Sequence, residues 1–195
     1  MTARNRKSWT KFAVVGAFAA ALVAGGTTYA FADTASAQTS IPGRFSLPAG
    51  APTPGAGFKI HSAYKVVTGV QIYTCTTQAD GTGAWSGSST PDATLLRYGT
   101  PGRIKHGAGP RWTYTRDGST LLGQLPPAQS VPKEGTIAWL LLNVTHESAG
   151  ALDPVTHISR VRTSGGVKPT TACTPGVTKD ARVRYGADYV FWTAA

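Results

Sequence analysis

Residues 104–123, IKHGAGPRWTYTRDGSTLLG, restrict the possible fold more than any other stretch of this sequence. Arg111 to Thr115 is rich in aromatic and β-branched residues and alternates in the manner of a strand. Asp117-Gly118 is among the strongest short hairpin signals, because glycine adopts the positive φ that a two-residue turn requires. Ser119 to Leu122 is predicted to run back as the next strand, and His106 to Pro110 to form a stiff loop. Antiparallel β-structure is therefore expected at the centre of the chain.

Similar short strands, separated by turn signals, are predicted along the rest of the chain. They are Phe58 to Val67, Gly69 to Cys75, Ala93 to Tyr98, Val155 to Thr163 and Ala181 to Thr193, the last with a bulge or bend at Gly186 and Ala187. Alternation places Gln71 on the face opposite Val70 and Ile72. In the predicted strand Val155 to Thr163, the same alternation places Arg160 on the same face as Ile158.

Thr136 to Val144, TIAWLLLNV, is the most apolar run outside the N-terminal region. Periodicity does not separate a buried strand from a short helix here. The preceding Gly135 and the brevity of the run favour a central strand. Leu125 to Gly135 is predicted to be a polar loop that contains proline. Together these elements predict an all-β, single-domain antiparallel β-sandwich or barrel of about nine or ten short strands.

The first 32 residues have the three parts of a secretory signal peptide. Met1 to Lys11 is short and basic, Phe12 to Ala24 is apolar, and small residues follow. The apolar run of about thirteen residues is shorter than the ~20 that cross a bilayer. Secretion with cleavage after Ala32 or Ala37 is therefore favoured over a membrane anchor, and membrane contact is expected only before cleavage.

Residues 33–57 are rich in proline and glycine and are predicted to be a flexible lead-in or an irregular arm. The predicted domain organisation is thus a signal peptide over 1–32, this lead-in over 33–57, and a β-rich domain over 58–195.

The formal net charge of the chain is +10. Four basic residues lie in the predicted leader, so fifteen basic and nine acidic residues remain, for a net charge of about +6. A modest positive charge favours anionic surfaces such as cell-wall polymers. The remaining basic residues are scattered and no nucleic-acid-binding motif is present, so nucleic acid is not an expected partner.

Cys75 and Cys173 are the only cysteines, and an even count in an exported protein favours one disulfide. There is no C-x-x-C spacing, and no histidine adjoins either cysteine. A structural bond is therefore favoured over a reactive thiol or a metal-binding pair.

Five motifs occur in a fixed order along the chain: GVQIYTC (Gly69 to Cys75), HGAGPRWTYTRDGSTLLG (His106 to Gly123), IAWLLL (Ile137 to Leu142), HISRVRTSGG (His157 to Gly166) and YGADYVFW (Tyr185 to Trp192). In this order they resemble an uncharacterised family of secreted bacterial and fungal proteins, known as domain of unknown function 3455. The resemblance covers nearly all of the chain after the lead-in. It implies export, a β-rich single domain and the cysteine pair, and it supplies no activity and no catalytic residues.

Catalytic motifs are weak in this sequence. No G-x-S-x-G nucleophile elbow is present. The histidines lack the spacing of H-E-x-x-H, so no metal site and no cofactor are predicted. His106 is the one histidine that an extracellular hydrolytic or metal-assisted enzyme could use, and this enzyme is the alternative functional hypothesis.

A binding role has more support from the residues of the central hairpin. Trp112 and Tyr114 supply aromatic faces, and Arg111, Arg103 and Lys105 surround them. Aromatic platforms with basic rims suit sugars or anionic wall polymers, although most such rings in a small β-domain belong to the core. The sequence therefore predicts a secreted, non-catalytic binding or structural domain that contacts extracellular polysaccharide or another anionic cell-surface polymer.

Overall fold

The computed structural model describes residues 37–195, all of which lie in strands, turns or irregular segments. The predicted signal peptide lies outside these residues. Within them, no helix is long and apolar enough to cross a membrane. The strands are β1 (Ser40–Ile41), β2 (Phe45–Ser46), β3 (Phe58–Tyr73), β4 (Cys75–Thr77), β5 (Gly83–Trp85), β6 (Thr90–Arg97), β7 (Arg103–Gly107), β8 (Arg111–Tyr114), β9 (Thr120–Gly123), β10 (Gln129–Val131), β11 (Trp139–Ser148), β12 (His157–Gly165) and β13 (Ala181–Ala194).

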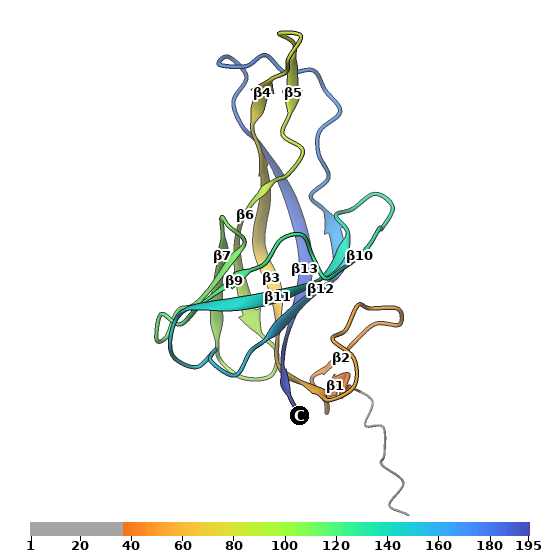
Figure 1. Cartoon of the computed structure of the whole chain (residues 1–195), viewed down its shortest axis with the longest axis vertical. Helices are drawn as coiled ribbons and strands as arrows, with labels where there is room; N and C mark the ends of the chain where they lie inside the picture. Colours follow the sequence, from red (N-terminus) through yellow and green to blue (C-terminus); the bar gives the residue numbers. More distant parts are fainter. Residues whose placement is uncertain (1–36) are drawn as a thin grey trace, which may run out of the picture. The chain divides into compact units, whose positions relative to one another are not determined.

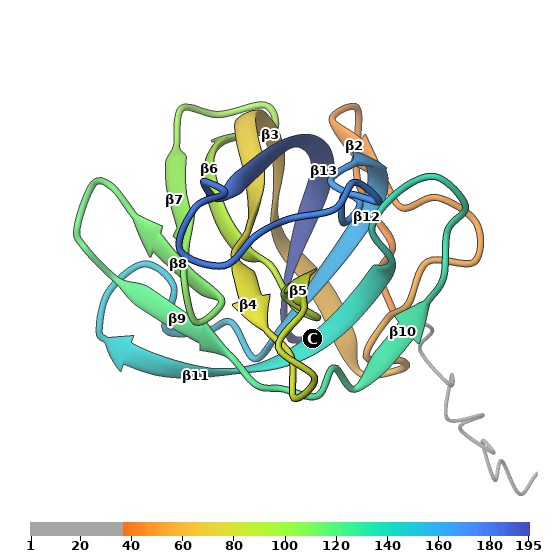
Figure 2. The same ribbon diagram turned by 90° about the horizontal axis from the view of Figure 1, so that it is seen from above.

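Eight of these strands close into an antiparallel barrel (Figure 2). Their order is β11-β12-β13-β3-β6-β7-β8-β9, and β9 pairs with β11 to complete the circle. The start of β11 pairs with β10, and its later part, from Val144 to Ser148, pairs with β9. The predicted all-β antiparallel domain is confirmed. Of the two predicted architectures, the barrel is the one that forms.

Alternation along the strands sends every second side chain into the barrel, where eight strands leave just enough room for side chains. On β8, for example, Trp112 and Tyr114 are buried while Arg111 is exposed. The interior is filled by aliphatic and aromatic residues: Tyr64, Val66, Leu95, Ile104, Trp112, Tyr114, Leu121, Leu142, Ile158, Tyr185, Tyr189 and Phe191.

The turn between β8 and β9 is longer than predicted. The Tyr114 N–H donates to the Ser119 carbonyl, and the Gly118 N–H donates to the Tyr114 carbonyl, both at 2.9 Å. Thr115 to Gly118 therefore form a four-residue loop, and the prediction of a two-residue turn is wrong. Gly118 has a φ of +77°, which confirms the predicted positive φ at this glycine.

Two segments predicted as loops contain strands. β7 lies in the glycine-rich stretch before Pro110 and pairs with both β6 and β8. β10 lies within the predicted loop from Leu125 to Gly135 and pairs with β11. In both cases the neighbouring strands supply hydrogen-bond partners that local propensity does not reveal.

Other strand predictions agree with the structure. The apolar run from Thr136 to Val144 lies largely in strand β11, as favoured, although the strand begins at Trp139 and continues to Ser148. The register of β13 against β3 shifts between Arg184 and Asp188, which confirms the bulge predicted there.

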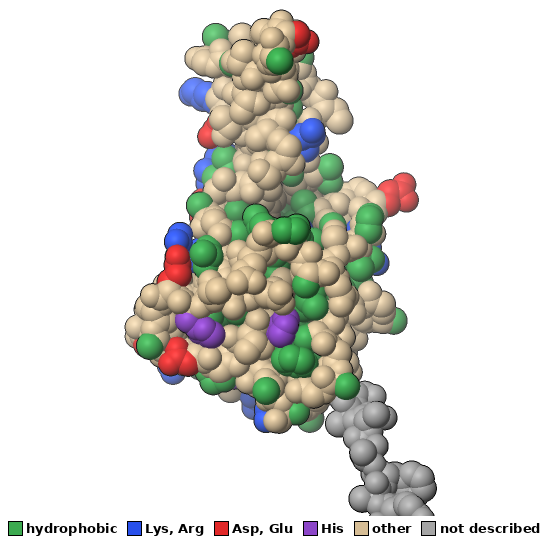
Figure 3. All heavy atoms as spheres, viewed as in Figure 1, with side chains coloured by type: hydrophobic (Ala, Val, Ile, Leu, Met, Phe, Trp, Pro, Cys, Tyr) green, Lys and Arg blue, Asp and Glu red, His purple; other side chains and the backbone are tan. Residues whose placement is uncertain are grey.

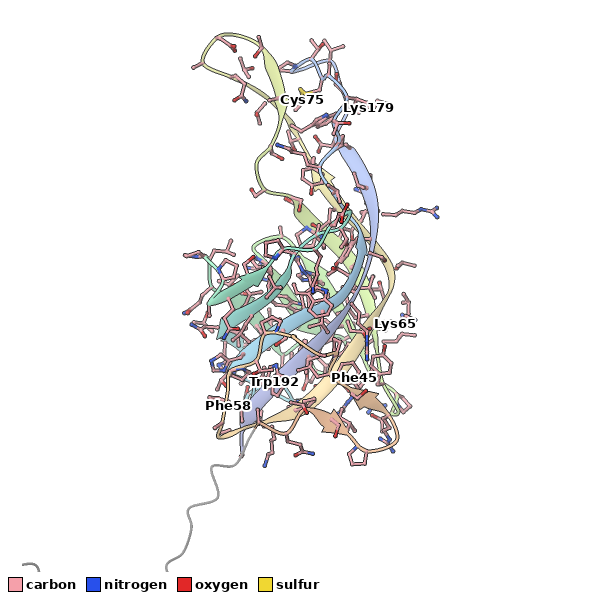
Figure 4. All side chains as sticks on the ribbon, turned by 90° about the vertical axis from the view of Figure 1, so that its right-hand side faces the viewer. Phe45, Phe58, Lys65, Cys75, Lys179 and Trp192 are labelled. Atoms are coloured by element: carbon pink, nitrogen blue, oxygen red, sulfur yellow. A yellow bond between two sulfur atoms is a disulfide. The ribbon has the colours of Figure 1, made fainter. Side chains whose placement is uncertain are left out.

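A narrow projection extends from one end of the barrel and contains β4, β5 and the segment before β13 (Figure 1). Cys75 is bonded to Cys173, which confirms the predicted disulfide; their Cα atoms are 6.0 Å apart. The indole Nε1 of Trp85 donates to the Thr171 carbonyl at 2.9 Å. Cys75 lies in this projection and Trp192 towards the opposite end of the barrel (Figure 4).

Residues 37–57 form an irregular arm on the outside of the barrel. Strands β1 and β2 make a small hairpin within it, and Phe45 is buried in a second apolar cluster with Trp192. The Ser159 hydroxyl donates to the Pro52 carbonyl at 2.7 Å and accepts from the Trp192 indole at 2.9 Å. The arm therefore covers part of the outer surface of the barrel, and residues on both faces of β12 and β13 are buried.

Candidate functional site

A pocket of about 460 Å³ opens at the end of the barrel from which the projection extends, and we call it the barrel-mouth pocket. Its volume lies in the ~300–1,000 Å³ range of small-molecule sites. Hydrophobic side chains gather where the projection meets the barrel (Figure 3). The pocket is lined by Gln71 and Tyr73 of β3, Thr90 and Pro91 of β6, His106 of β7, Leu140 and Leu142 of β11, Arg160 of β12, and loop residues 87–89, Gly109, Pro110 and Leu125.

Gln71 is the most deeply buried polar side chain of the pocket wall, with 2% of its surface exposed. Its Oε1 accepts a hydrogen bond of 2.6 Å from the Ser89 hydroxyl. Its Nε2 has no partner among the described residues. An unsatisfied buried donor costs about 1–3 kcal/mol, and native proteins retain few of them. The Gln71 amide is therefore available to a molecule in the pocket.

Arg160 supplies the only charge among the lining residues. Its Nε and Nη2 both donate to the Ala138 carbonyl, at 3.0 and 2.9 Å, and these two bonds orient the guanidinium. Its Nη1 makes no hydrogen bond to any residue in the described part of the chain. A fixed cation with a free donor therefore borders the same space as the Gln71 amide.

His106 lies between the barrel core and the pocket. Its ring is 4% exposed, stacks on Trp112 with centroids 4.4 Å apart, and meets the Tyr189 ring edge-on at 5.0 Å. Burial lowers the pKa of His106 to about 3; the Arg111 hydrogen bond opposes this shift and the Arg160 charge adds to it. The neutral ring donates from Nδ1 to the Arg111 carbonyl at 2.8 Å, so Nε2 carries no proton and can only accept.

The rest of the pocket wall is largely apolar. Leu140 and Leu142 belong to this wall, and Leu125, with 68% of its surface exposed, borders the pocket from the loop that joins β9 to β10. The Tyr73 hydroxyl is not free, because it donates to the Gly166 carbonyl at 2.7 Å. The pocket thus combines a few polar groups with apolar walls, an arrangement typical of sites for small ligands.

Residues 100–193 match the family model described as "Protein of unknown function (DUF3455)". Over this stretch the chain is similar to that family. No curated protein and no solved structure matches the chain. The matched stretch includes β7 to β12 and nearly all of β13, and with them His106 and Arg160. Gln71 lies before it, so the barrel-mouth pocket combines residues from inside and outside the DUF3455 match.

The structure separates the residues that the sequence grouped as a surface binding site. Trp112 and Tyr114 are 1% and 7% exposed and point into the barrel, so their rings offer no platform to a polymer. Arg111 forms an ion pair with Glu147, with a 2.7 Å bond from Nη2 to Oε1. Arg103 and Lys105 are exposed on the outside of β7. Within the DUF3455 stretch, the central hairpin therefore contributes mainly to the core.

Sequence reasoning placed His106 in a loop and gave no role to Gln71 or Arg160. The structure places all three on strands that face the barrel-mouth pocket. The available signal was alternation, which put Arg160 on the same face as Ile158. Nothing in the sequence showed that this face lines the inside of a closed barrel.

A second polar cluster, at the outer surface of the barrel, has its hydrogen bonds satisfied within the fold. Asp188, 4% exposed, accepts from the Tyr98 hydroxyl at 2.8 Å and from Arg162 Nη1 at 3.1 Å. Burial, followed by the Asp188 hydrogen bond, raises the pKa of Tyr98 to about 12. Arg162, at the unusual φ of +47°, also donates from Nη2 to the Ser46 carbonyl at 2.8 Å. This cluster ties the arm to the barrel.

No group of three or more His, Cys, Asp or Glu side chains within residues 37–195 is arranged to hold a metal ion. His106 has a backbone carbonyl as its hydrogen-bond partner rather than a second titratable side chain. The described residues therefore favour the barrel-mouth pocket, with Gln71 and Arg160, as the candidate site.

Proposed function

We propose that the mature protein is a secreted, non-catalytic binding protein that holds a small ligand in the barrel-mouth pocket. The unpartnered amide of Gln71, which lines the same pocket as Arg160, carries this proposal, because a ligand could satisfy both donors. Secretion is supported by the signal-peptide pattern of residues 1–32. It is also supported by the disulfide, since such bonds persist mainly in oxidising compartments.

Hydrolysis through His106 has weaker support than binding. A general base works best when its pKa lies near the working pH, and burial lowers the pKa of His106 to about 3. No nucleophile or carboxylate among the described residues is hydrogen-bonded to its ring. The imidazole instead packs between Trp112 and Tyr189, as a core residue would.

A variant whose pocket is filled by a larger side chain tests the binding proposal. We expect N-phenyl-1-naphthylamine, an uncharged fluorescent probe, to bind the protein saturably with a stoichiometry of one. Leu140→Trp should fill the pocket and weaken binding by at least about tenfold, or about 1.4 kcal/mol. Leu96→Trp is the matched control, because Leu96 is 41% exposed on the outer face. Equal fluorescence titrations for the two variants would rule out this pocket as the site.

Contact with an anionic cell-surface polymer is a second candidate, favoured by a row of exposed cations on the outside of the barrel. We call this the outer basic row, and it consists of Lys65, Arg103 and Lys105. Leu96 of β6 is paired with both Lys65 and Arg103, so these two cations flank it directly. Lys105 lies on the same face and donates to the Thr94 hydroxyl at 2.9 Å. Exposed cations of this kind attract polyanions in a salt-dependent way.

Dextran sulfate and uncharged dextran distinguish this candidate from sugar binding alone. We expect only dextran sulfate to bind, and we expect the binding to weaken as salt is added. Neutralising the outer basic row with three Lys/Arg→Gln changes should weaken binding more than neutralising Lys168, Lys179 and Arg184, which are also exposed. An equal loss in both triple variants would show that net charge alone is responsible.

A further inference from the structure

We propose that the ligand of the barrel-mouth pocket is a small amphipathic monocarboxylate, held by Arg160 and Gln71. This inference rests on the proposed function and specifies its ligand. Arg160 is the only charged residue of the lining, and no Asp or Glu borders the pocket. The unsatisfied atom of Gln71 is a donor rather than an acceptor. Both features suit an anion.

The number of charges favours a monoanion over a dianion such as phosphate. Arg160 provides a single positive charge, and part of its hydrogen-bonding capacity is used on the Ala138 carbonyl. His106 adds no charge, because its ring remains neutral near neutral pH. A second negative charge would enter the pocket without compensation, which is costly away from water. A carboxylate has two oxygens, one for Arg160 Nη1 and one for Gln71 Nε2.

The apolar walls define the other end of the ligand. Leu140 and Leu142 are available to an apolar body, and Pro110 and Leu125 border the same space. Leu125 is 68% exposed, and a large hydrophobic side chain in that position gains from being covered. Gln71, in contrast, is almost fully buried. The ligand is therefore oriented with its carboxylate at the inner wall and its apolar body toward Leu125.

The test compares 4-phenylbutyrate with 4-phenylbutyramide, which has nearly the same shape and no charge, by calorimetric titration at pH 7. We expect the carboxylate to bind at least about tenfold more tightly, because hydrogen bonds to a charged acceptor are stronger than those to a neutral one. Arg160→Met and Gln71→Leu should each remove most of this preference while binding of the amide changes little. Arg160→Lys keeps the charge but loses the fork of donors, so it should give an intermediate affinity.

Arg116→Met is the matched control, because it removes the same charge from an exposed position outside the pocket. It should leave the preference for the carboxylate unchanged. Retained N-phenyl-1-naphthylamine binding identifies variants that still have a folded pocket.

The possible failures can be distinguished. If the probe binds the parent protein but the carboxylate and the amide bind equally or not at all, the carboxylate inference is wrong and the pocket proposal survives. If neither the probe nor the two ligands bind, both are wrong. If inorganic phosphate displaces 4-phenylbutyrate more effectively than acetate does, the choice of a monoanion is wrong.

Discussion

We expect His106→Ala to lower the free energy of unfolding by roughly 2–4 kcal/mol at pH 7, because the change leaves a cavity and an unpaired carbonyl. The ring that is lost stacks on Trp112 and packs edge-on against Tyr189. The Arg111 carbonyl also loses its 2.8 Å hydrogen bond from Nδ1. Urea unfolding of the protein from residue 33 onward measures the change. His146→Ala is the control, because His146 is exposed on β11 and should cost little.

The same histidine should make stability depend on pH. Its pKa is lowered by burial from an ordinary 6.5 to about 3 in the folded protein. Below pH 6.5 His106 binds a proton in the unfolded chain but stays neutral in the folded protein. The free energy of unfolding therefore falls as the pH decreases toward 3. The slope from this one group is at most ~1.4 kcal/mol per pH unit.

A comparison of variants isolates the contribution of His106. Burial also lowers the pKa of His61 and His157, and their effects have the same sign. Unfolding should therefore be measured between pH 7 and pH 5 for the parent and for His106→Gln. We expect the parent to lose stability more steeply as the pH falls. Parallel curves would mean that His106 titrates normally and is not buried.

The sequence predicts that His106 lies in a loop, and a change to alanine at an exposed loop residue would cost less than ~1 kcal/mol. Its neighbours Gly107, Gly109 and Pro110 are typical of turns, so the local sequence does not indicate the five-residue strand β7. β7 exists because β6 and β8 flank it and supply its backbone hydrogen bonds. Pairing of this kind depends on the closed barrel and leaves no local signal.

Alternation correctly separates the two faces of each strand, but it does not tell which face points into the barrel. Val70 and Ile72 look like core residues, yet they are only half-buried, and Gln71 between them is 2% exposed inside the barrel. On β12 both Ile158 and Val161 are fully buried although they face opposite sides. The arm of residues 37–57 covers the outer side of β12, so a hydrophobic side chain on this strand can face either the arm or the barrel interior. Gln71 and Arg160 can be identified as pocket residues only when the closed barrel is known.

The central hairpin gives the complementary case. Its strands, its positive φ at Gly118 and its aromatic content all follow from the sequence. The role of Trp112 does not, because an alternating aromatic residue fits a binding platform and a barrel interior equally well. Closure of β9 onto β11 decides between them by enclosing the ring.

Removal of the disulfide is expected to be the second large perturbation. A Cys75→Ala/Cys173→Ala double variant should lose about 2–4 kcal/mol of stability, because the bond closes a loop with a sequence separation of 98. The chain-entropy model assigns this stabilisation to the restricted unfolded chain. Guanidinium unfolding of the parent and the double variant, both without reductant, measures the difference. Mass analysis of the parent should show two hydrogens missing relative to its reduced form.

The location of the bond predicts where the folded state loosens. Outside the barrel, the projection has two strands of three residues each, so it has little core of its own. The indole hydrogen bond from Trp85 to the Thr171 carbonyl helps to hold the segment before β13. In the double variant we expect faster hydrogen exchange at the Trp85 indole and in the backbone of β4 and β5, while amides of β7 and β8 keep their protection relative to global unfolding. The lower global stability alone will speed hydrogen exchange to some extent. If exchange is faster than this in all the barrel strands, the disulfide supports the whole barrel. Unchanged unfolding midpoints would contradict the stabilising role itself.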